Sequence, residues 1–243
     1  MTRAGLKARL RNSLVHPRGL AHRELHRVVA AVGPRLRGRL LDVGCGSKPY
    51  AEALTAVESY VGLDTAATMH GLERVDVVGT ALALPFRGRR FDSVLCTEVL
   101  EHTPEPLTAL QEIWRVTRPG GLLLLTVPMS EQLHEEPADF YRFTHYGARY
   151  LLIKAGFRVL EVHDRGGPWL ELGYRTSSLL YSTLGARRDA AGRLHARPLI
   201  GPLVVAVCLI VQAAALAADR LWRPPLSTIG YALLAERPAE AAG

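Results

Sequence analysis

Residues 40–50 read Leu-Leu-Asp-Val-Gly-Cys-Gly-Ser-Lys-Pro-Tyr, a short apolar run that ends in an acid and two closely spaced glycines. Such a run is typical of a central strand in a parallel sheet, so we predict a buried strand with Asp42 near its carboxyl end. Gly44 and Gly46 then allow a tight turn and a close approach of the main chain to a ligand. A dinucleotide fingerprint needs another glycine where Pro49 stands, so the pattern disfavours a pyrophosphate site.

A second apolar stretch, Tyr60 to Thr65, contains Asp64. This acid follows the glycine turn by roughly 20 residues, which is the spacing of a ribose-binding acid. A carboxylate at the tip of the second strand can accept hydrogen bonds from both ribose hydroxyls. The alternative is that Asp64 only caps a helix.

Three further motifs follow in order: Leu-Pro-Phe at 84–86, Phe-Asp at 91–92 leading into Thr-Glu-Val-Leu-Glu-His at 97–102, and Arg-Pro-Gly-Gly at 118–121. Together with the glycine turn, this order resembles the class I S-adenosylmethionine (SAM)-dependent methyltransferases over about residues 38–128. The resemblance implies an α/β fold, a Rossmann-like sandwich. Its seven-stranded sheet is mostly parallel, with the last strand antiparallel and helices on both faces.

The resemblance implies SAM as the cofactor and assigns binding residues by position. They are Asp42, Gly44, Cys45 and Gly46 in the first loop, Asp64 and Thr65 after the second strand, Ala81 and Leu82 in the adenine loop, and Glu98 after the fourth strand. Many relatives carry an aspartate where this chain has Thr80, whose hydroxyl can accept a hydrogen bond but supplies no charge. That departure keeps a noncatalytic scaffold as an alternative.

Methyl transfer from SAM is an in-line displacement, so the protein must mainly position and desolvate the reactants. An oxygen or nitrogen acceptor must also lose a proton. His102 and His134 are the candidate bases, because imidazole titrates near neutrality. Tyr141 and Arg142 are candidates for holding a hydroxyl or an anionic group of the acceptor. For His102 the alternative is packing or solvent contact, and for His134 it is a loop that is disordered until substrate arrives. For Tyr141 it is packing of the loop onto the sheet. We predict no metal site.

The chain has 243 residues, 48% of them hydrophobic, which is enough for one α/β core with attachments. We expect a basic helical segment at 1–37, the core at 38–165, a hydrophobic helical insertion at 166–225, and the last core strand with a tail at 226–243. The three cysteines are an odd number without metal-ligand spacing, which favours a reduced compartment. The arginine-rich start lacks the apolar block of a secretory signal, so we expect a cytoplasmic protein.

The formal net charge is +7, and the basic residues cluster in two places. These are Arg3, Lys7, Arg9, Arg11, Arg18, Arg23 and Arg27 near the start, and Arg187, Arg188, Arg193 and Arg197 before a long apolar run. Such clusters suit nucleic-acid phosphates, anionic lipid headgroups or plain solvation. The sequence shows no RNA-binding module or aromatic ladder, so we expect no nucleic-acid partner. An RNA methyltransferase is the alternative that the charge motivates.

Residues 199–218 carry no charge and only Gln212 as a polar side chain. As a helix they would extend about 30 Å, enough to cross a membrane. However, the stretches 157–162 and 229–234 are predicted strands of one sheet, which a single crossing would separate. We therefore expect an inserted helical pair that lies on, or re-enters, the inner face of an anionic membrane. Burial in a homodimer interface is the alternative.

The acceptor is expected to be a small molecule or one linked to lipid or glycan, because the insertion is unusually hydrophobic. The stretch 134–144 resembles a subgroup of bacterial methyltransferases, some of them linked to polysaccharide or glycolipid biosynthesis. The sequence names neither the acceptor nor the atom that is methylated.

Overall fold

The computed structural model describes residues 13–188 and 194–239. The chain divides into two compact units, each described here by itself. The sheet unit comprises Val28–Met129, Leu133–His163 and Gly230–Gly243, and the helical unit comprises Met1–Arg27, Ser130–Gln132 and Asp164–Ile229. The predictions for Arg3, Lys7, Arg9, Arg11, Arg193 and the side chain of Arg188 lie outside the described residues.

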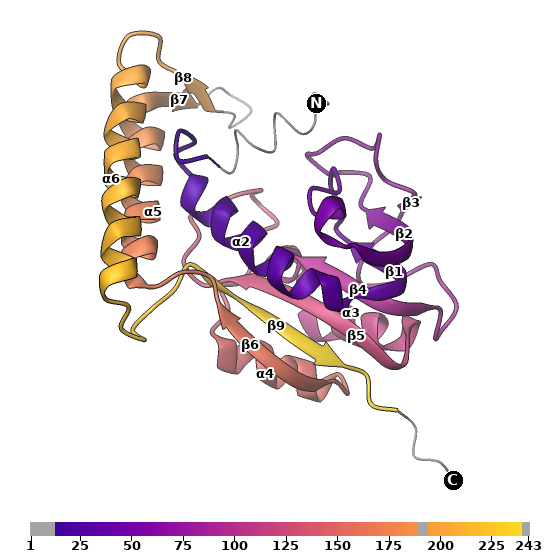
Figure 1. The fold of residues 1–243 in the computed structure, drawn as a ribbon. Helices are drawn as coiled ribbons and strands as arrows, with labels where there is room; N and C mark the ends of the chain where they lie inside the picture. The colour runs from indigo at the N-terminus through magenta and orange to yellow at the C-terminus, as the bar shows by residue number, and fades with distance from the viewer. Residues whose placement is uncertain (1–12, 189–193, 240–243) are drawn as a thin grey trace. The chain divides into compact units, whose positions relative to one another are not determined.

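Seven strands form the core of the sheet unit (Figure 1). They are β1 (Arg37–Val43), β2 (Ala56–Asp64), β3 (Val77–Val78), β4 (Phe91–Thr97), β5 (Thr117–Pro128), β6 (Arg158–Asp164) and β9 (Gly230–Glu236). Their order is β3-β2-β1-β4-β5-β9-β6. The five strands from β3 to β5 pair in parallel, and β9 runs antiparallel to β5. The predicted α/β fold and its antiparallel last strand are therefore confirmed.

Helices α3 (Pro106–Val116) and α4 (His145–Lys154) pack against each other and contribute to the main apolar core. Leu41 and Val43 of β1 belong to that core, so the alternation of the strand sends Asp42 to the opposite face. Removal of apolar surface from water stabilises this core by roughly 25 cal/mol per Å² of surface buried. The core therefore fixes where the strands end, and with them the loops that follow.

The fifth strand begins earlier than expected. The sequence predicts a turn at 118–121 followed by a strand, whereas β5 already pairs with β4 at Thr117. The register shifts between the pairs made by Phe91 and Ser93, and Gly120 has φ +77°. The glycine therefore makes an irregularity inside a long strand, because a positive φ is accessible to glycine at no steric cost.

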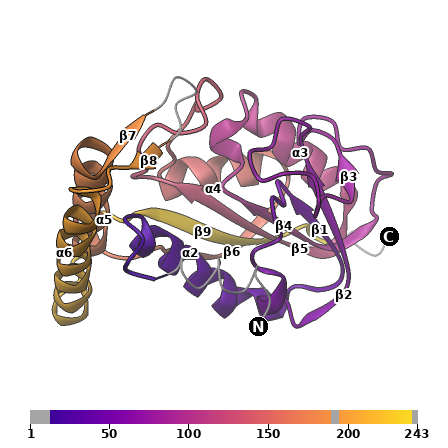
Figure 2. The same cartoon turned by 90° about the horizontal axis from the view of Figure 1, so that it is seen from above.

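The helical unit contains α5 (Pro168–Leu180) and α6 (Gly201–Leu221), which lie side by side (Figures 1 and 2). A five-residue π-helical turn, Tyr181–Gly185, and a small hairpin of β7 (Ala186–Arg188) with β8 (Leu194–Ala196) connect them. A Cβ built on Gly173 would lie 2.4 Å from the Cβ of Ala215, so the glycine permits close packing of the two helices. Helix α2 (Gly19–Val32) begins in this unit.

Helix α6 buries a side that carries Gln212 and Asp219 among small and apolar residues, and it exposes a side that is largely apolar. The Gln212 side chain is buried, donates to the carbonyl oxygens of Leu14 and His16, and accepts from the backbone N–H of Leu20. In contrast, Leu203 is 67% exposed and Ile210 is 68% exposed. Among the described helices, only α6 is long and apolar enough to cross a membrane, and only 28% of its apolar window is buried.

Some of the basic residues near the start of the chain are held by ion pairs within the helical unit. Arg18 pairs with Glu131, which also accepts a hydrogen bond from the Tyr174 hydroxyl. Arg27 pairs with Glu24. Arg18 and Arg27 are therefore less available to an anionic partner than their spacing in the sequence indicates.

Candidate cofactor and acceptor site

The carboxyl ends of β1, β4 and β5 meet at one edge of the sheet. Val43 at the end of β1 lies beside Cys96 of β4, and Thr97 lies beside Thr126 of β5. The strand order reverses direction between β1 and β4, and ligands of open α/β sheets bind in the crevice at such a point. The glycine turn, the segment after β4 and the loop after β5 therefore belong to one site.

The glycine turn has the backbone that the sequence predicts. Gly44 and Gly46 have φ values of +72° and +47°. A Cβ on Gly44 would lie 2.3 Å from Cγ2 of Val99, so this position tolerates no side chain. Cys45 between them is buried, and burial raises the pKa of its thiol to about 12. The turn therefore offers main-chain atoms to a ligand, and its cysteine stays a neutral thiol.

Asp64 lies at the end of β2 and holds the glycine turn. Its Oδ2 accepts from the backbone N–H of Gly46 at 2.8 Å and from the Thr68 hydroxyl at 3.2 Å, and its Oδ1 accepts from the N–H of Thr65 at 2.7 Å. The structure thus brings Gly46, Asp64 and Thr65 together, as the prediction of a shared site requires. Since an ionised carboxylate has about four acceptor positions, Asp64 retains capacity for a ribose hydroxyl.

Asp42 is 1% exposed, and its partner is the Tyr60 hydroxyl on the neighbouring strand. Burial raises the pKa of the Asp42 carboxyl to about 7, and the hydrogen bond from Tyr60 opposes part of that shift. Nearby, Lys48 on the glycine turn pairs with Asp76, whose carboxylate also accepts from the N–H of Gly62. The Asp42 side chain therefore bonds to the neighbouring strand, and its contact with a cofactor stays a prediction.

Asp42→Asn is expected to stabilise the ligand-free protein at pH 8 by up to about 4 kcal/mol and to have little effect at pH 4. The folded state holds the proton up to about pH 7, whereas an unfolded aspartate loses it near pH 4. Stability therefore falls as pH rises through this window and stays low above it. Thermal melts from pH 4 to 8 check this.

The control is Asp92→Asn, at a carboxylate whose pKa is lowered by hydrogen bonds from the Arg39 backbone N–H and from Arg118, which outweigh its partial burial. Its stabilisation is present at neutral pH and is lost as pH falls, so Asp92→Asn should destabilise at pH 8. A pH-independent effect of Asp42→Asn would contradict the buried-carboxyl interpretation.

The predicted adenine loop is fixed to the helix behind it. The N–H of Leu84 donates to Glu112 at 2.8 Å, and Arg115 donates to the carbonyl oxygen of Phe86 at 2.8 Å. The Thr80 hydroxyl accepts from the N–H of Leu82 at 3.2 Å. Ala81, which lies between Thr80 and Leu82 in the sequence, is buried. Thr80 therefore shapes the turn, and binding of adenine by Ala81 and Leu82 stays a prediction.

Glu98 follows β4 with φ +54°, a left-handed conformation that is uncommon outside glycine. Its carboxylate accepts from the Thr126 hydroxyl at 2.9 Å, and its N–H donates to the Thr126 carbonyl oxygen. Strained residues of this kind concentrate at functional sites, where the surrounding structure holds them in place. The conformation supports the prediction that Glu98 lies in the cofactor site.

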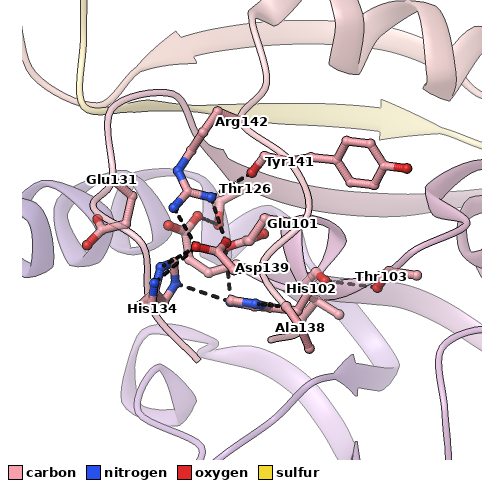
Figure 3. Close-up of polar contacts among 12 residues, drawn as sticks. Glu101, His102, Thr103, Thr126, Glu131, His134, Ala138, Asp139, Tyr141 and Arg142 are labelled. Carbon is pink, nitrogen blue, oxygen red and sulfur yellow. Dashed lines mark hydrogen bonds and ion pairs between the residues drawn. The ribbon is translucent and has the colours of Figure 1, made fainter. Parts of the chain in front are cut away.

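The two candidate bases are in contact with each other (Figure 3). Nε2 of His102 lies 3.1 Å from Nε2 of His134, and Nδ1 of His102 lies 2.7 Å from the carbonyl oxygen of Ala138. A carbonyl can only accept, so Nδ1 of His102 donates to it, and Nε2 of the same ring faces His134. The sequence predicted both histidines for this site but not their pairing.

Tyr141 and Arg142 both have partners within the protein. The Tyr141 hydroxyl donates to the carbonyl oxygen of Pro104 at 2.9 Å, and its ring points away from the imidazole pair (Figure 3). Arg142 makes two hydrogen bonds to Asp139, at 2.7 and 2.8 Å, which with the contact from His134 lower the pKa of Asp139 to about 2. A role for either residue in holding the acceptor stays a prediction.

Two further residues of the site, Glu101 and Asp139, were not predicted from the sequence. Glu101 is fully buried, and its Oε1 lies 3.9 Å from Nε2 of His102. Asp139 accepts from the N–H of His134 at 3.0 Å. A signal for Glu101 was present, because an acid directly precedes His102. No local pattern pairs Asp139 with His134, since the shape of the loop brings them together.

Comparison with known proteins gives matches over the same region. Residues 41–125 match a methyltransferase domain family. The chain is 29% identical over 197 residues to a demethylmenaquinone methyltransferase of Renibacterium salmoninarum, covering 70% of this chain and 82% of that protein. It is 34% identical over 126 residues to a ubiquinone biosynthesis O-methyltransferase of Alkalilimnicola ehrlichii, covering 47% of this chain and 49% of that protein. The chain thus spans about half the length of its ubiquinone-biosynthesis relative.

Solved structures share the fold at low sequence identity. A [4+2]-cyclase, SpnF, aligns with a TM-score of 0.54 at 22% identity and covers 88% of this chain and 82% of its own. Phosphoethanolamine N-methyltransferase 2 of Haemonchus contortus aligns with a TM-score of 0.54 at 17% identity, covering 95% of this chain and 59% of its own. These likenesses establish the architecture, and the reaction must be argued from the site.

Proposed function

Because this chain belongs to the class I SAM-dependent methyltransferases, we propose that it transfers the methyl group of SAM to a quinone precursor carrying an apolar chain, at the surface of a membrane. Two relatives named for menaquinone and ubiquinone biosynthesis support the acceptor class. The exposed apolar face of α6 carries the proposal, because it gives the enzyme a means of reaching an acceptor dissolved in lipid.

At the sheet edge, the glycine turn and Asp64 hold SAM, with Asp64 accepting from the ribose and the turn contacting the amino acid part. Ala81 and Leu82 lie along the adenine, and Glu98 completes this side of the site. SAM supplies an activated methyl group, so these residues position and desolvate it. The proton of the acceptor is taken up at the pair His102 and His134, whose Nε2 atoms lie 3.1 Å apart.

The apolar face of α6 is proposed to lie in the membrane surface without crossing the bilayer. β6 and β9 belong to one sheet, so a single crossing between them is excluded. A hairpin of two crossings needs a second long apolar helix, but α5 has 13 residues and carries Glu171 and Arg175. At 1.5 Å per residue it extends about 20 Å, short of the roughly 30 Å that a bilayer core requires.

Basic and aromatic residues flank the exposed face at both ends. Arg187 and Arg197 are exposed before α6, and Arg220 and Arg223 are exposed at its end beside Trp222. Arginine attracts anionic headgroups, and tryptophan is enriched at the membrane interface. We infer a peripheral position on the cytoplasmic leaflet. The three cysteines are free and buried, which fits a reducing compartment.

Tritiated SAM tests the proposed function with reduced demethylmenaquinone as the probe acceptor, either embedded in anionic vesicles or replaced by a soluble analogue without the prenyl chain. We expect label in the vesicle-embedded acceptor, at least about 10-fold faster than in the soluble analogue, because shared binding to the vesicle raises the effective concentration. Equal rates would contradict the membrane-presented acceptor. No transfer to either probe, by protein that binds SAM, would contradict the quinone-precursor class.

A further inference from the structure

We propose that Glu101, His102 and His134 form a binding site for a divalent first-row metal ion, with Zn²⁺ as the ion that best fits the donors. One carboxylate oxygen and two imidazole nitrogens lie within 4.8 Å of one another. Two histidines and a glutamate are an established ligand set for catalytic zinc, with room left for another ligand. This proposal departs from the sequence-based prediction of no metal site, which stays a prediction.

The separation of the two ring nitrogens suits a shared ion. With metal–nitrogen bonds of about 2.05 Å, two ligands are about 2.9 Å apart at a right angle and about 3.3 Å apart at the tetrahedral angle. The observed distance between Nε2 of His102 and Nε2 of His134 is 3.1 Å. Oε1 of the Glu101 carboxylate lies 3.9 Å from Nε2 of His102, so it has to move closer to the two imidazoles to complete the set.

In both imidazoles the ring nitrogen that faces away from the proposed ion, Nδ1, lies near an oxygen atom of a neighbouring residue. Nδ1 of His102 donates to the carbonyl oxygen of Ala138 at 2.7 Å, and Nδ1 of His134 lies 3.6 Å from Oδ2 of Asp139. A metal-binding histidine typically directs its other ring nitrogen at a carbonyl or carboxylate. Arg142 holds Asp139 in place through two hydrogen bonds to its carboxylate. The two histidine ligands are therefore already positioned by the Ala138 carbonyl group and the Asp139 carboxylate.

The loop that carries His134 is fastened to the segment that carries the other two ligands. The N–H groups of Phe140 and Tyr141 both donate to the carbonyl oxygen of Glu101, at 2.8 and 3.3 Å. The side chains of His102 and His134 are 16% and 21% exposed, and that of Glu101 is fully buried. An ion would thus be shielded on the Glu101 side and open on the imidazole side, where an acceptor can reach it.

The consequence for catalysis rests on the proposed function. A divalent ion lowers the pKa of a hydroxyl group that binds to it. An ion at these nitrogens would therefore ease loss of the acceptor proton to solvent. In the metal-bound protein this would replace direct uptake of the proton by the imidazole pair, because both Nε2 lone pairs would bind the ion. Glu98 and the glycine turn follow β4 and β1 at this same edge of the sheet, so the ion would lie beside the proposed cofactor site.

Calorimetric titration of the EDTA-treated full chain with ZnCl₂, beside a parallel titration with MgCl₂, tests the site without any methyl transfer. We expect one Zn²⁺ per chain and much weaker Mg²⁺ binding, because imidazole favours zinc. Glu101→Gln and His134→Ala should each weaken Zn²⁺ binding by more than about 100-fold, whereas Asp139→Asn should weaken it by about 10- to 100-fold.

His163→Ala is the matched control, because His163 is a partly exposed histidine paired with Glu161 on β6. This variant should bind Zn²⁺ as the parent does, and SAM binding by each variant reports an intact fold. A parent protein that binds SAM but no Zn²⁺ would overturn the metal site and leave the proposed function standing. Unchanged Zn²⁺ binding in both ligand variants would also overturn it. Zn²⁺ binding without SAM binding would contradict only the proposed function.

Discussion

Asp64→Ala is expected to weaken SAM binding by about 10- to 150-fold, the equivalent of 1.5–3 kcal/mol for hydrogen bonds to a charged group. Calorimetric titration with SAM and with S-adenosylhomocysteine measures this. The change removes the proposed ribose acceptor. It also removes the partner of the Gly46 N–H, which shapes the turn that the cofactor contacts.

Asp64→Asn separates these two contributions. The amide oxygen can still accept from Gly46 or Thr65, but the charge is lost and one acceptor becomes a donor. If Asp64 only shapes the turn, Asn should restore most of the affinity, whereas a ribose acceptor should leave Asn nearly as weak as Ala. Retention of full SAM affinity by Asp64→Ala would contradict both roles.

Asp92→Ala is the matched control for this experiment. Asp92 lies at the start of β4, at the opposite end of that strand from the site, where it accepts from the Arg39 N–H at 2.9 Å and pairs with Arg118. We expect a lower melting temperature with unchanged SAM affinity. Absence of SAM binding by the folded parent protein would favour the scaffold alternative, because the fold alone does not fix the reaction.

The sequence predicted the parts of the site that depend on local backbone chemistry. Gly44 and Gly46 have the positive φ values that only glycine adopts freely, and Asp64 lies at the strand end where the spacing placed it. These positions follow from strand length and turn geometry, which neighbouring residues determine. The seven-stranded sheet, which the resemblance to the methyltransferases implied, is also confirmed.

The sequence could not predict contacts between segments that are far apart in the chain. The imidazole pair depends on how the loop after β5 folds back onto Glu101, which the hydrogen bonds of Phe140 and Tyr141 decide. The burial of Asp42 against Tyr60 depends on the register of β1 with β2. Likewise, no pattern in 186–196 indicated the small hairpin of β7 and β8.

The sequence also could not predict which side of helix α6 is buried. The apolar run 199–218 predicted a helix, and the structure has one at Gly201–Leu221. Gln212 would ordinarily mark the exposed side of such a helix, but it is buried and bound to backbone groups. The solvent-facing side is left with apolar residues, and this inversion could be seen only in the fold.

The double variant Leu203→Glu/Ile210→Glu is expected to abolish binding to vesicles of phosphatidylcholine and phosphatidylglycerol, as measured by flotation. Burying a leucine or isoleucine side chain is worth about 1.5–3 kcal/mol, so loss of both lowers the partition coefficient by about 100- to 10,000-fold. The two side chains are 67% and 68% exposed, so the fold should tolerate the change. SAM affinity should stay at the parent value.

Ile153→Glu provides the matched control, because Ile153 is a 54% exposed apolar residue on α4. It should bind vesicles as the parent does if the α6 face is specific. Light scattering on the parent and the double variant tests the homodimer alternative. A dimeric parent that the variant converts to monomer, with no vesicle binding by either, would assign the face to a second copy of the chain. Vesicle binding by the parent that the variant loses would assign it to lipid, because an exposed apolar face of this kind marks a membrane or protein interaction site and the variant removes only that face.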